Sequence, residues 1–325
     1  MQVTDPMRVT ILGGAGFLGR KLARRLAAEG GVERLILFDM AEPEAPEGAP
    51  FPVRCLAGDV ADTRALAAAI PEGTTHVVHL AAVVSAAAEA DYELGLRVNL
   101  HGALAVLDAC RRLAAPPRLV FTSSVASFSG GQQACLADDA RQVPLNSYGA
   151  QKAAAELLIQ DASRRGLVDA VSIRLPTVII RPGRPNAAAS SFVSAILREP
   201  LLGLETPLPV PEAFRVWVCS PSLAVGWLRH AMGMDTAPLG PDRGINPPGL
   251  SVSVAEMLAA LDAPSRALVR PAPDARIEAI VGGWPASFEA GRARALGFAE
   301  QPGLAAILAE FLREDLAATR AERER

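Results

Sequence analysis

Tyr148 and Lys152 have the spacing of a pair that takes a proton from an alcohol. In a helix that opens at Tyr148 the two side chains lie on one face, one turn apart. An unperturbed tyrosine has a pKa of about 10, too high for a base near neutral pH, and a lysine ammonium one turn away lowers that pKa. Tyr-x-x-x-Lys is common by chance and usually marks a solvated helix face. Ser124, at the end of an earlier predicted strand, favours the catalytic interpretation because its hydroxyl can orient the substrate oxygen.

A glycine-rich loop follows the apolar run Arg8–Leu12, which predicts a buried strand. Gly13, Gly16 and Gly19 recur every three residues before a predicted helix. A pyrophosphate at a helix N-terminus needs close backbone approach, which a side chain at Gly13 or Gly16 would obstruct, and Gly19 permits tight helix–strand packing. The alternative, a turn without a ligand, is disfavoured by the strand-to-helix context.

Asp39 ends the second predicted strand, Arg34–Phe38. A carboxylate there can accept hydrogen bonds from the adenosine ribose hydroxyls and repels a 2′-phosphate, which predicts NAD rather than NADP. The alternatives are a turn or cap aspartate, and the nearby Arg24 and Arg34 leave a 2′-phosphate open. Asp59 follows the third strand, where it can accept from the adenine amino group or cap the next helix.

Strands and helices alternate through the first half of the chain, which predicts an α/β, doubly wound (Rossmann) parallel sheet. Strands are expected at 8–12, 34–38, 52–56, 75–80, 118–122 and 170–175, with helices at 62–70, 92–114 and 148–165. Later elements are a strand at 214–219, helices opening at Pro221 and Ser287, a capping box at Ser253-x-x-Glu256, and helices at 191–198 and 303–317. We expect residues 1–180, with a return at about 214–248, to bind NAD. Residues 181–213 and 249–325 then form a smaller, mostly helical substrate-binding lobe.

Composition restricts the class of protein. The chain has 325 residues, enough for a full core, and its net charge of −3 gives no general reason to bind nucleic acid or an acidic membrane. No apolar run has the length of a membrane span. The four cysteines and four histidines are scattered, so we expect no disulfide framework and no metal site, and a reducing cytoplasm fits.

The motifs together resemble the extended short-chain dehydrogenases/reductases, the NAD-dependent epimerase/dehydratase family. The similarity rests on the Gly13–Gly19 loop, His79–Ala82, Asn99, the Thr-Ser-Ser ending at Ser124, and Tyr148 with Lys152. It implies a catalytic triad of Ser124, Tyr148 and Lys152, and a homodimer paired through the helices 92–114 and 148–165. The residues expected to bind the cofactor are Gly13, Gly16, Phe17, Leu18, Gly19, Asp39, Asp59, Val60, Leu80, Ala81, Ala82, Asn99, Thr122, Lys152, Pro176, Thr177 and Val178.

The chain departs from nucleotide-sugar enzymes of this family at Thr177, where those enzymes usually carry Asn, and it lacks their Tyr-Gly-Pro. The blocks Arg181–Phe192 and Gly249–Met257 instead resemble a subgroup that oxidises the 2-hydroxyl of the four-carbon sugar acid D-erythronate with NAD. A sugar acid needs a cation for its carboxylate and hydroxyl or amide groups for its alcohols. The residues expected to supply these are Ser85, Ser124, Tyr148, Arg184, Asn186, Ser190, Ser191 and Arg215.

The sequence leaves alternatives open for the substrate cation and for the reaction. Either Arg184 or Arg215 can be the cation; an arginine after Pro-Gly is often a surface turn residue, and Ser191 can simply open a helix.

A nucleotide-sugar epimerase or dehydratase would hold NAD tightly and release no NADH. A non-catalytic NAD-binding regulator is disfavoured because such proteins commonly lose the tyrosine or the lysine, and both are present here.

Overall fold

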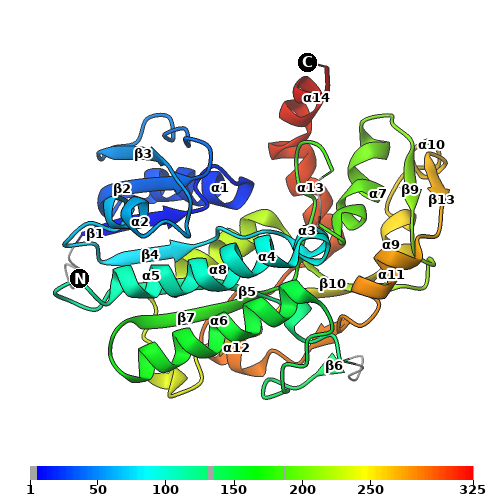
Figure 1. Cartoon of the computed structure of the whole chain (residues 1–325). Coiled ribbons are helices and arrows are strands. Elements are labelled where there is room, and N and C mark those ends of the chain that lie inside the picture. The colour runs from blue at the N-terminus through cyan, green and yellow to red at the C-terminus, as the bar shows by residue number, and fades with distance from the viewer. Residues whose placement is uncertain (1–5, 131–134, 186–187, 325) are drawn as a thin grey trace.

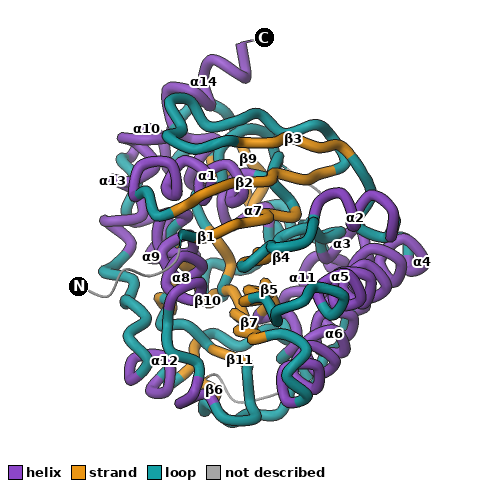
Figure 2. The backbone as a smooth tube through the Cα atoms, turned by 90° about the vertical axis from the view of Figure 1, so that its left-hand side faces the viewer, coloured by secondary structure: helices purple, strands orange, loops and turns teal. Residues whose placement is uncertain are grey.

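The computed structural model describes residues 6–130, 135–185 and 188–324. Its centre is a seven-stranded sheet in the order β11-β7-β5-β4-β1-β2-β3, in which every neighbouring pair is parallel. Figure 2 shows these strands stacked through the middle of the molecule. The strands are β1 (Met7–Leu12), β2 (Val32–Asp39), β3 (Val53–Ala57), β4 (His76–His79), β5 (Arg118–Ser124), β7 (Asp169–Leu175) and β11 (Gly244–Ile245). The predicted doubly wound α/β fold is confirmed.

Helices cover both faces of this sheet because its strands are apolar on both sides. In β1 the side chains of Val9 and Ile11 belong to one core cluster and Leu12 belongs to another, as the alternation of a strand requires. The first cluster includes residues of α1 (Phe17–Glu29) and α8 (Pro221–Gly233). The second includes residues of α2 (Thr63–Ala69), α5 (Gly102–Cys110) and α6 (Ser147–Arg164), and Figure 1 shows α5 and α6 running along the sheet.

The helix expected over 92–114 is not uniform. It consists of α4 (Tyr92–Gly95), a π-helical segment at Leu96–His101, and α5. A π-helical turn is wider than an α-helical turn and often lies at a functional site. Here it carries Asn99, whose side chain accepts a hydrogen bond from the Val83 amide at 2.9 Å and donates to the Val83 carbonyl at 3.0 Å. Asn99 therefore holds the segment that follows β4.

The remaining elements combine helices with short strands, so this part is less helical than expected. A three-stranded sheet contains β8 (Thr177–Val178), β10 (Arg215–Cys219) and β12 (Leu250–Ser253). Two further strand pairs join β9 (Thr206–Leu208) to β13 (Val269–Pro271) and β6 (Cys135–Leu136) to β14 (Ser287–Phe288). The helices are α3 (Ser85–Ala90), α7 (Ser191–Leu201), α9 (Val254–Ala259), α10 (Ala263–Arg266), α11 (Ala275–Val281), α12 (Gly291–Ala295), α13 (Leu304–Glu314) and α14 (Leu316–Glu324).

Two of the predicted helix starts are confirmed and one is wrong. Ser220 caps α8 by accepting from the Leu223 amide at 3.2 Å, and Ser253 and Glu256 form the predicted reciprocal capping box of α9. The prediction that Ser287 opens a helix was wrong, because Ser287 pairs with Cys135 in a parallel strand and the helix begins at Gly291. In the described part of the chain, no helix combines the length and apolar character needed to cross a membrane.

Candidate active site

A cleft of about 550 Å³ lies at the carboxyl ends of the strands of the main sheet, where open α/β sheets bind ligands. Segments that follow β1, β2, β4, β5 and β7 form one wall, and residues of the smaller, mixed part of the molecule form the other. The cleft is lined by these expected residues: Gly13, Gly16, Phe17, Leu18, Gly19, Asp39, Asp59, Val60, Leu80, Ala81, Ala82, Ser85, Thr122, Ser124, Tyr148, Lys152, Pro176, Thr177 and Val178.

The glycine loop has the geometry of a phosphate cradle. Gly13 has a φ of +94°, and a Cβ there would lie 2.8 Å from the amide nitrogen of Ala81, so a side chain would collide with the segment after β4. A Cβ at Gly19 would overlap the carbonyl oxygen of Gly13. Gly16 is the N-cap residue of α1 and has no side chain to cap the helix. The first turn of α1 therefore lies at the cleft wall. The amide groups of such a turn can bind the pyrophosphate of a dinucleotide.

Asp39 lies beside this cradle at the end of β2. Its carboxylate accepts hydrogen bonds from the amides of Ala15 at 3.0 Å and Met40 at 2.7 Å, which fixes its orientation in the cleft wall. A fixed acceptor at the end of the second strand fits the ribose hydroxyls of NAD.

Asp59 also lines the cleft, and it does not cap the next helix. The N-cap of α2 is Asp62, whereas Asp59 accepts from the Ala61 amide at 2.9 Å and forms an ion pair with Arg97. Burial raises the pKa of Asp59, but the Ala61 hydrogen bond and the Arg97 charge outweigh it, so the pKa is lowered overall. Asp59 is therefore an ionised acceptor in the cleft wall.

The start of α6 brings Tyr148 toward Ser124. Asn146 caps the helix by accepting from the Gly149 amide at 2.7 Å. A Cβ at Gly149 would overlap the carbonyl oxygen of Ala126, so the helix begins in direct contact with the turn that follows β5. The side chains of Tyr148 and Ser124 both line the cleft, and Ser124 acts on the tyrosine to lower its pKa. Two of the three residues of the expected triad therefore lie close together.

Burial and charge act in opposite directions on the two titratable groups of the triad. Burial raises the pKa of Tyr148, and the hydrogen bond with Ser124 and the positive charge of Arg181 counteract that rise. Lys152 is 1% exposed, donates from Nζ to the Thr122 carbonyl at 2.8 Å, and has its pKa lowered by burial to about 7. Arg181 therefore contributes a positive charge that acts on Tyr148. The sequence motifs did not indicate this role for Arg181.

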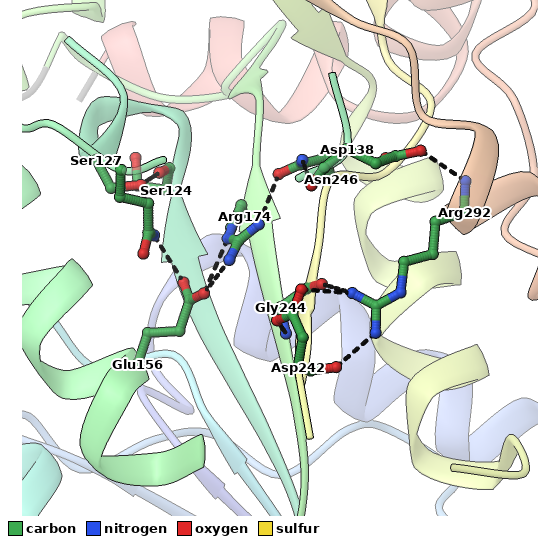
Figure 3. A network of polar contacts seen from close by, with 10 residues as sticks. Ser124, Ser127, Asp138, Glu156, Arg174, Asp242, Gly244, Asn246 and Arg292 are labelled. Carbon is green, nitrogen blue, oxygen red and sulfur yellow. Dashed lines mark hydrogen bonds and ion pairs between the residues drawn. The ribbon is translucent and has the colours of Figure 1, made fainter. Parts of the chain in front are cut away.

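A buried polar network supports the turn at Ser124 (Figure 3). The Ser127 hydroxyl donates to the Ser124 carbonyl at 2.8 Å, and Gln142 donates to Ser127 at 3.0 Å and to Glu156 at 3.1 Å. Arg174 donates from Nε and Nη2 to one oxygen of Glu156, at 2.9 and 2.6 Å. The network therefore links β7 and α6 to the residue that contacts Tyr148.

The expected substrate-binding residues are only partly brought to the cleft. Ser85 lines it and accepts from the Ala189 amide at 3.1 Å. Ser191 opens α7 outside the cleft lining. Arg184 is exposed and also lies outside the lining. Asn186 falls outside the described residues. Asn99, expected at the cofactor, is buried behind the cleft wall.

Arg215 was expected in the substrate site, and it lies outside the cleft lining. It lies at the exposed start of β10, pairs with Glu256 at 3.1 Å, and donates to the Ser251 carbonyl at 3.1 Å. The capping box of α9 holds Glu256 next to it, so a neighbouring carboxylate already faces this guanidinium.

Several cleft residues were not predicted. They are Phe38, Met40, Gly58, Val83, Val84, Leu94, Arg97, Val98, Ser123, Val125, Leu175, Arg181, Ala188 and Trp284. Arg181 belongs to the block Arg181–Phe192, so its position shortly after β8 was an available signal. Ser190, which the sequence did predict, lies in the cleft lining. Trp284 comes from a distant segment and has no local signal.

Known proteins resemble this chain along most of its length. A model of the NAD-dependent epimerase/dehydratase family matches residues 9–217. The chain is 44% identical to D-erythronate dehydrogenase of Cupriavidus necator, covering 95% of this chain and 98% of that protein. It is 40% identical to D-erythronate dehydrogenase of Haemophilus influenzae, covering 95% and 100%. A solved structure, described as the nucleoside-diphosphate-sugar epimerase from Agrobacterium tumefaciens, has a TM-score of 0.89 and 43% identity, covering 97% of this chain and 96% of that one.

The cleft and these likenesses agree. A glycine cradle at the first helix, an acidic residue at the end of β2, and a Ser-Tyr contact beside a buried lysine are the parts that a nicotinamide-dependent enzyme of this fold requires. The chain therefore belongs to the NAD-dependent epimerase/dehydratase family.

Proposed function

We propose that the protein oxidises the 2-hydroxyl of D-erythronate to a 2-oxo acid, with NAD as cofactor. The observation that carries this proposal is that Ser124, Tyr148 and Lys152 line the same cleft as the glycine cradle. The substrate follows from the two D-erythronate dehydrogenases that match nearly the whole chain. Residues 1–180 and the return through α8 and β11 then hold the cofactor, and residues 181–213 and 249–325 cover the substrate.

In the proposed reaction Tyr148, as phenolate, takes the proton of the substrate hydroxyl. Ser124 hydrogen-bonds the same oxygen and keeps it within reach of the tyrosine. Gly13, Gly16, Gly19 and Asp39 would hold NAD, which supplies the acceptor for the hydride of C2. The carbonyl at C2 forms as the O–H and C–H bonds break, one proton passing to Tyr148.

Lys152 has two tasks in this proposal. It is fixed by its hydrogen bond to the Thr122 carbonyl and packs over the Phe121 ring, 4.7 Å from the ring centre. This position keeps the lysine amine at the base of the cleft, on the helix face of Tyr148, where its protonated form stabilises the phenolate. The same nitrogen is also the group expected to hold the ribose of the cofactor.

The second candidate is a nucleotide-sugar epimerase. It is favoured by the solved structure with that description, which is 43% identical to this chain. Thr177, a cleft residue, stands where such enzymes usually carry Asn, and Arg181 lies where a sugar-acid carboxylate has use for a cation. An epimerase returns its hydride to the sugar and releases no NADH, whereas a dehydrogenase releases one NADH for each turnover.

The deciding experiment measures NADH formation by the purified protein with NAD and a panel of D-erythronate, L-threonate, D-glycerate and UDP-sugars. We expect NADH with D-erythronate and faster turnover with NAD than with NADP. Tyr148→Phe should lower kcat by about 10²- to 10⁴-fold and retain NAD affinity. Absence of NADH from every acid, with conversion of a UDP-sugar, would instead support the epimerase. A non-catalytic regulator would bind NAD and convert nothing.

A homodimer through α5 and α6 belongs to the same proposal. The two helices pack against each other and present apolar side chains outward: Leu104 is 40%, Leu157 61% and Leu158 43% exposed. Leucines at these exposures on adjoining helices form a face that a second copy can cover. We also propose a cytoplasmic location, in keeping with the four cysteines, all of which are free thiols.

A further inference from the structure

Arg181 is a fixed cation in the cleft wall. It lies three residues beyond the end of β8, and its side chain lines the cleft together with Tyr148 and Ser190. Nε donates to the Val178 carbonyl at 3.0 Å and Nη2 donates to the Ser190 hydroxyl at 3.2 Å. Arg198 donates to the Arg181 carbonyl at 2.7 Å, which also fixes the main chain. The guanidinium group is therefore oriented before any substrate binds.

The charges in the cleft are divided between its two ends. Among the described lining residues the acidic side chains are Asp39, the last residue of β2, and Asp59, which follows β3; both lie at the proposed cofactor cradle. Arg97 is paired with Asp59. The part of the lining around Tyr148 is rich in hydroxyl groups, and Arg181 adds a guanidinium to it. This end suits a ligand that carries both alcohols and a negative charge.

The position of Arg181 relative to the base has chemical consequences. In a 2-hydroxy acid the carboxylate is bonded to the carbon that carries the reacting hydroxyl. A cation that binds the carboxylate must therefore lie close to the base that takes the hydroxyl proton. Arg181 meets this condition, since its charge acts on the Tyr148 phenol, whereas Arg184 and Arg215 lie outside the cleft lining.

We propose that Arg181 binds the substrate carboxylate and makes the enzyme selective for anionic 2-hydroxy acids over uncharged polyols and amides. This inference rests on the proposed dehydrogenase activity and deepens it. A guanidinium group can donate two parallel hydrogen bonds to one carboxylate, and such a pair is stronger in a partly buried cleft than in water. Ser190, held by the same guanidinium, and Ser85 are placed to bind the alcohols of the chain.

The experiment compares kcat/KM for D-erythronate with kcat/KM for its neutral amide. We expect the wild-type enzyme to prefer the acid by about 10²-fold, the effect of hydrogen bonds to a charged group. In Arg181→Gln that preference should fall to within about threefold, and Arg181→Lys should restore part of it. Because both substrates are measured on one preparation, the ratio does not depend on the fraction of enzyme that is folded. Arg164→Gln, an exposed arginine on α6 paired with Asp161, is the matched control.

A second readout is the pH profile. Ser124, Lys152 and Arg181 face the Tyr148 hydroxyl from β5, α6 and the segment after β8, and Arg198 and Cys219 are the further charged or titratable groups around Arg181. Removing the Arg181 charge should move the acidic limb of kcat/KM for the neutral amide to higher pH. A purely structural role would leave that limb in place.

The outcomes separate the two proposals. Wild-type enzyme that forms no NADH from any acid refutes the dehydrogenase function, and the Arg181 inference with it, before a variant is made. Turnover with an acid preference that survives in Arg181→Gln overturns the Arg181 inference alone. The same holds if Arg184→Gln or Arg215→Gln abolishes the preference, because the carboxylate would then be bound elsewhere.

Discussion

Replacing Arg174 tests whether the network beneath Ser124 holds the site together. Glu156 is 2% exposed and Arg174 is 7% exposed, so the two charges are compensated inside the protein rather than by water. Arg174→Met keeps the length of the side chain and its packing against Phe128, whose ring centre is 5.3 Å from the guanidinium carbon. Glu156 would keep its hydrogen bond from Gln142 and lose both from Arg174. Leaving one buried charge uncompensated costs about 3–5 kcal/mol.

The assay is urea unfolding followed by tryptophan fluorescence. We expect the free energy of unfolding to fall by about 3–5 kcal/mol in Arg174→Met. Arg164→Met removes an exposed ion pair to Asp161 and should change it by less than about 1 kcal/mol. The double variant Glu156→Met with Arg174→Met leaves no orphan charge and should recover at least about half of the loss.

Two results would refute this reasoning. A loss below about 1 kcal/mol in Arg174→Met would show that water or another group compensates Glu156. A double variant as unstable as the single one would show that the pair matters through its shape and not its charge. In either case the network of Figure 3 would not be the support of the Ser124 turn.

Three further predictions concern the cofactor, the base and the dimer. Gly19→Ala should weaken NAD binding about 10- to 100-fold in a fluorescence titration. The reason is that the new Cβ would overlap the Gly13 carbonyl and displace the glycine loop. Unchanged affinity would contradict the proposal that this loop binds the pyrophosphate. Burial raises the pKa of Tyr148, so kcat/KM should rise with pH through the neutral range with a slope of about one, and a flat profile would exclude the phenol as the base. Leu157→Glu with Leu158→Glu should halve the mass seen by light scattering, and a mass unchanged from wild type would place the dimer contact elsewhere.

Local patterns predicted six of the seven strands of the main sheet and several helix starts, but they missed the two-residue strand β11. The strand predicted at 8–12 is β1, the capped helix at Pro221 is α8, and the box at Ser253 starts α9. Each signal depends on neighbours a few residues apart, so the backbone periodicity and the cap chemistry decide it. The π-helical turn at Leu96–His101 was missed because an apolar helical pattern does not distinguish an α-helical turn from a wider one.

The sequence by itself determined which residues of the proposed cofactor end and triad line the cleft, since the Gly13–Gly19 loop, Asp39 and the Tyr148–Lys152 pair each lie on a single element or at its end. Which arginine of this segment lines the cleft was decided only by the tertiary structure. The segment after β8 is positioned by contacts across the chain, such as the hydrogen bond from the Ala189 amide to Ser85. Such contacts join residues about a hundred positions apart, and no local spacing encodes them. In the resulting fold Arg181 lines the cleft and Arg184 lies outside the lining.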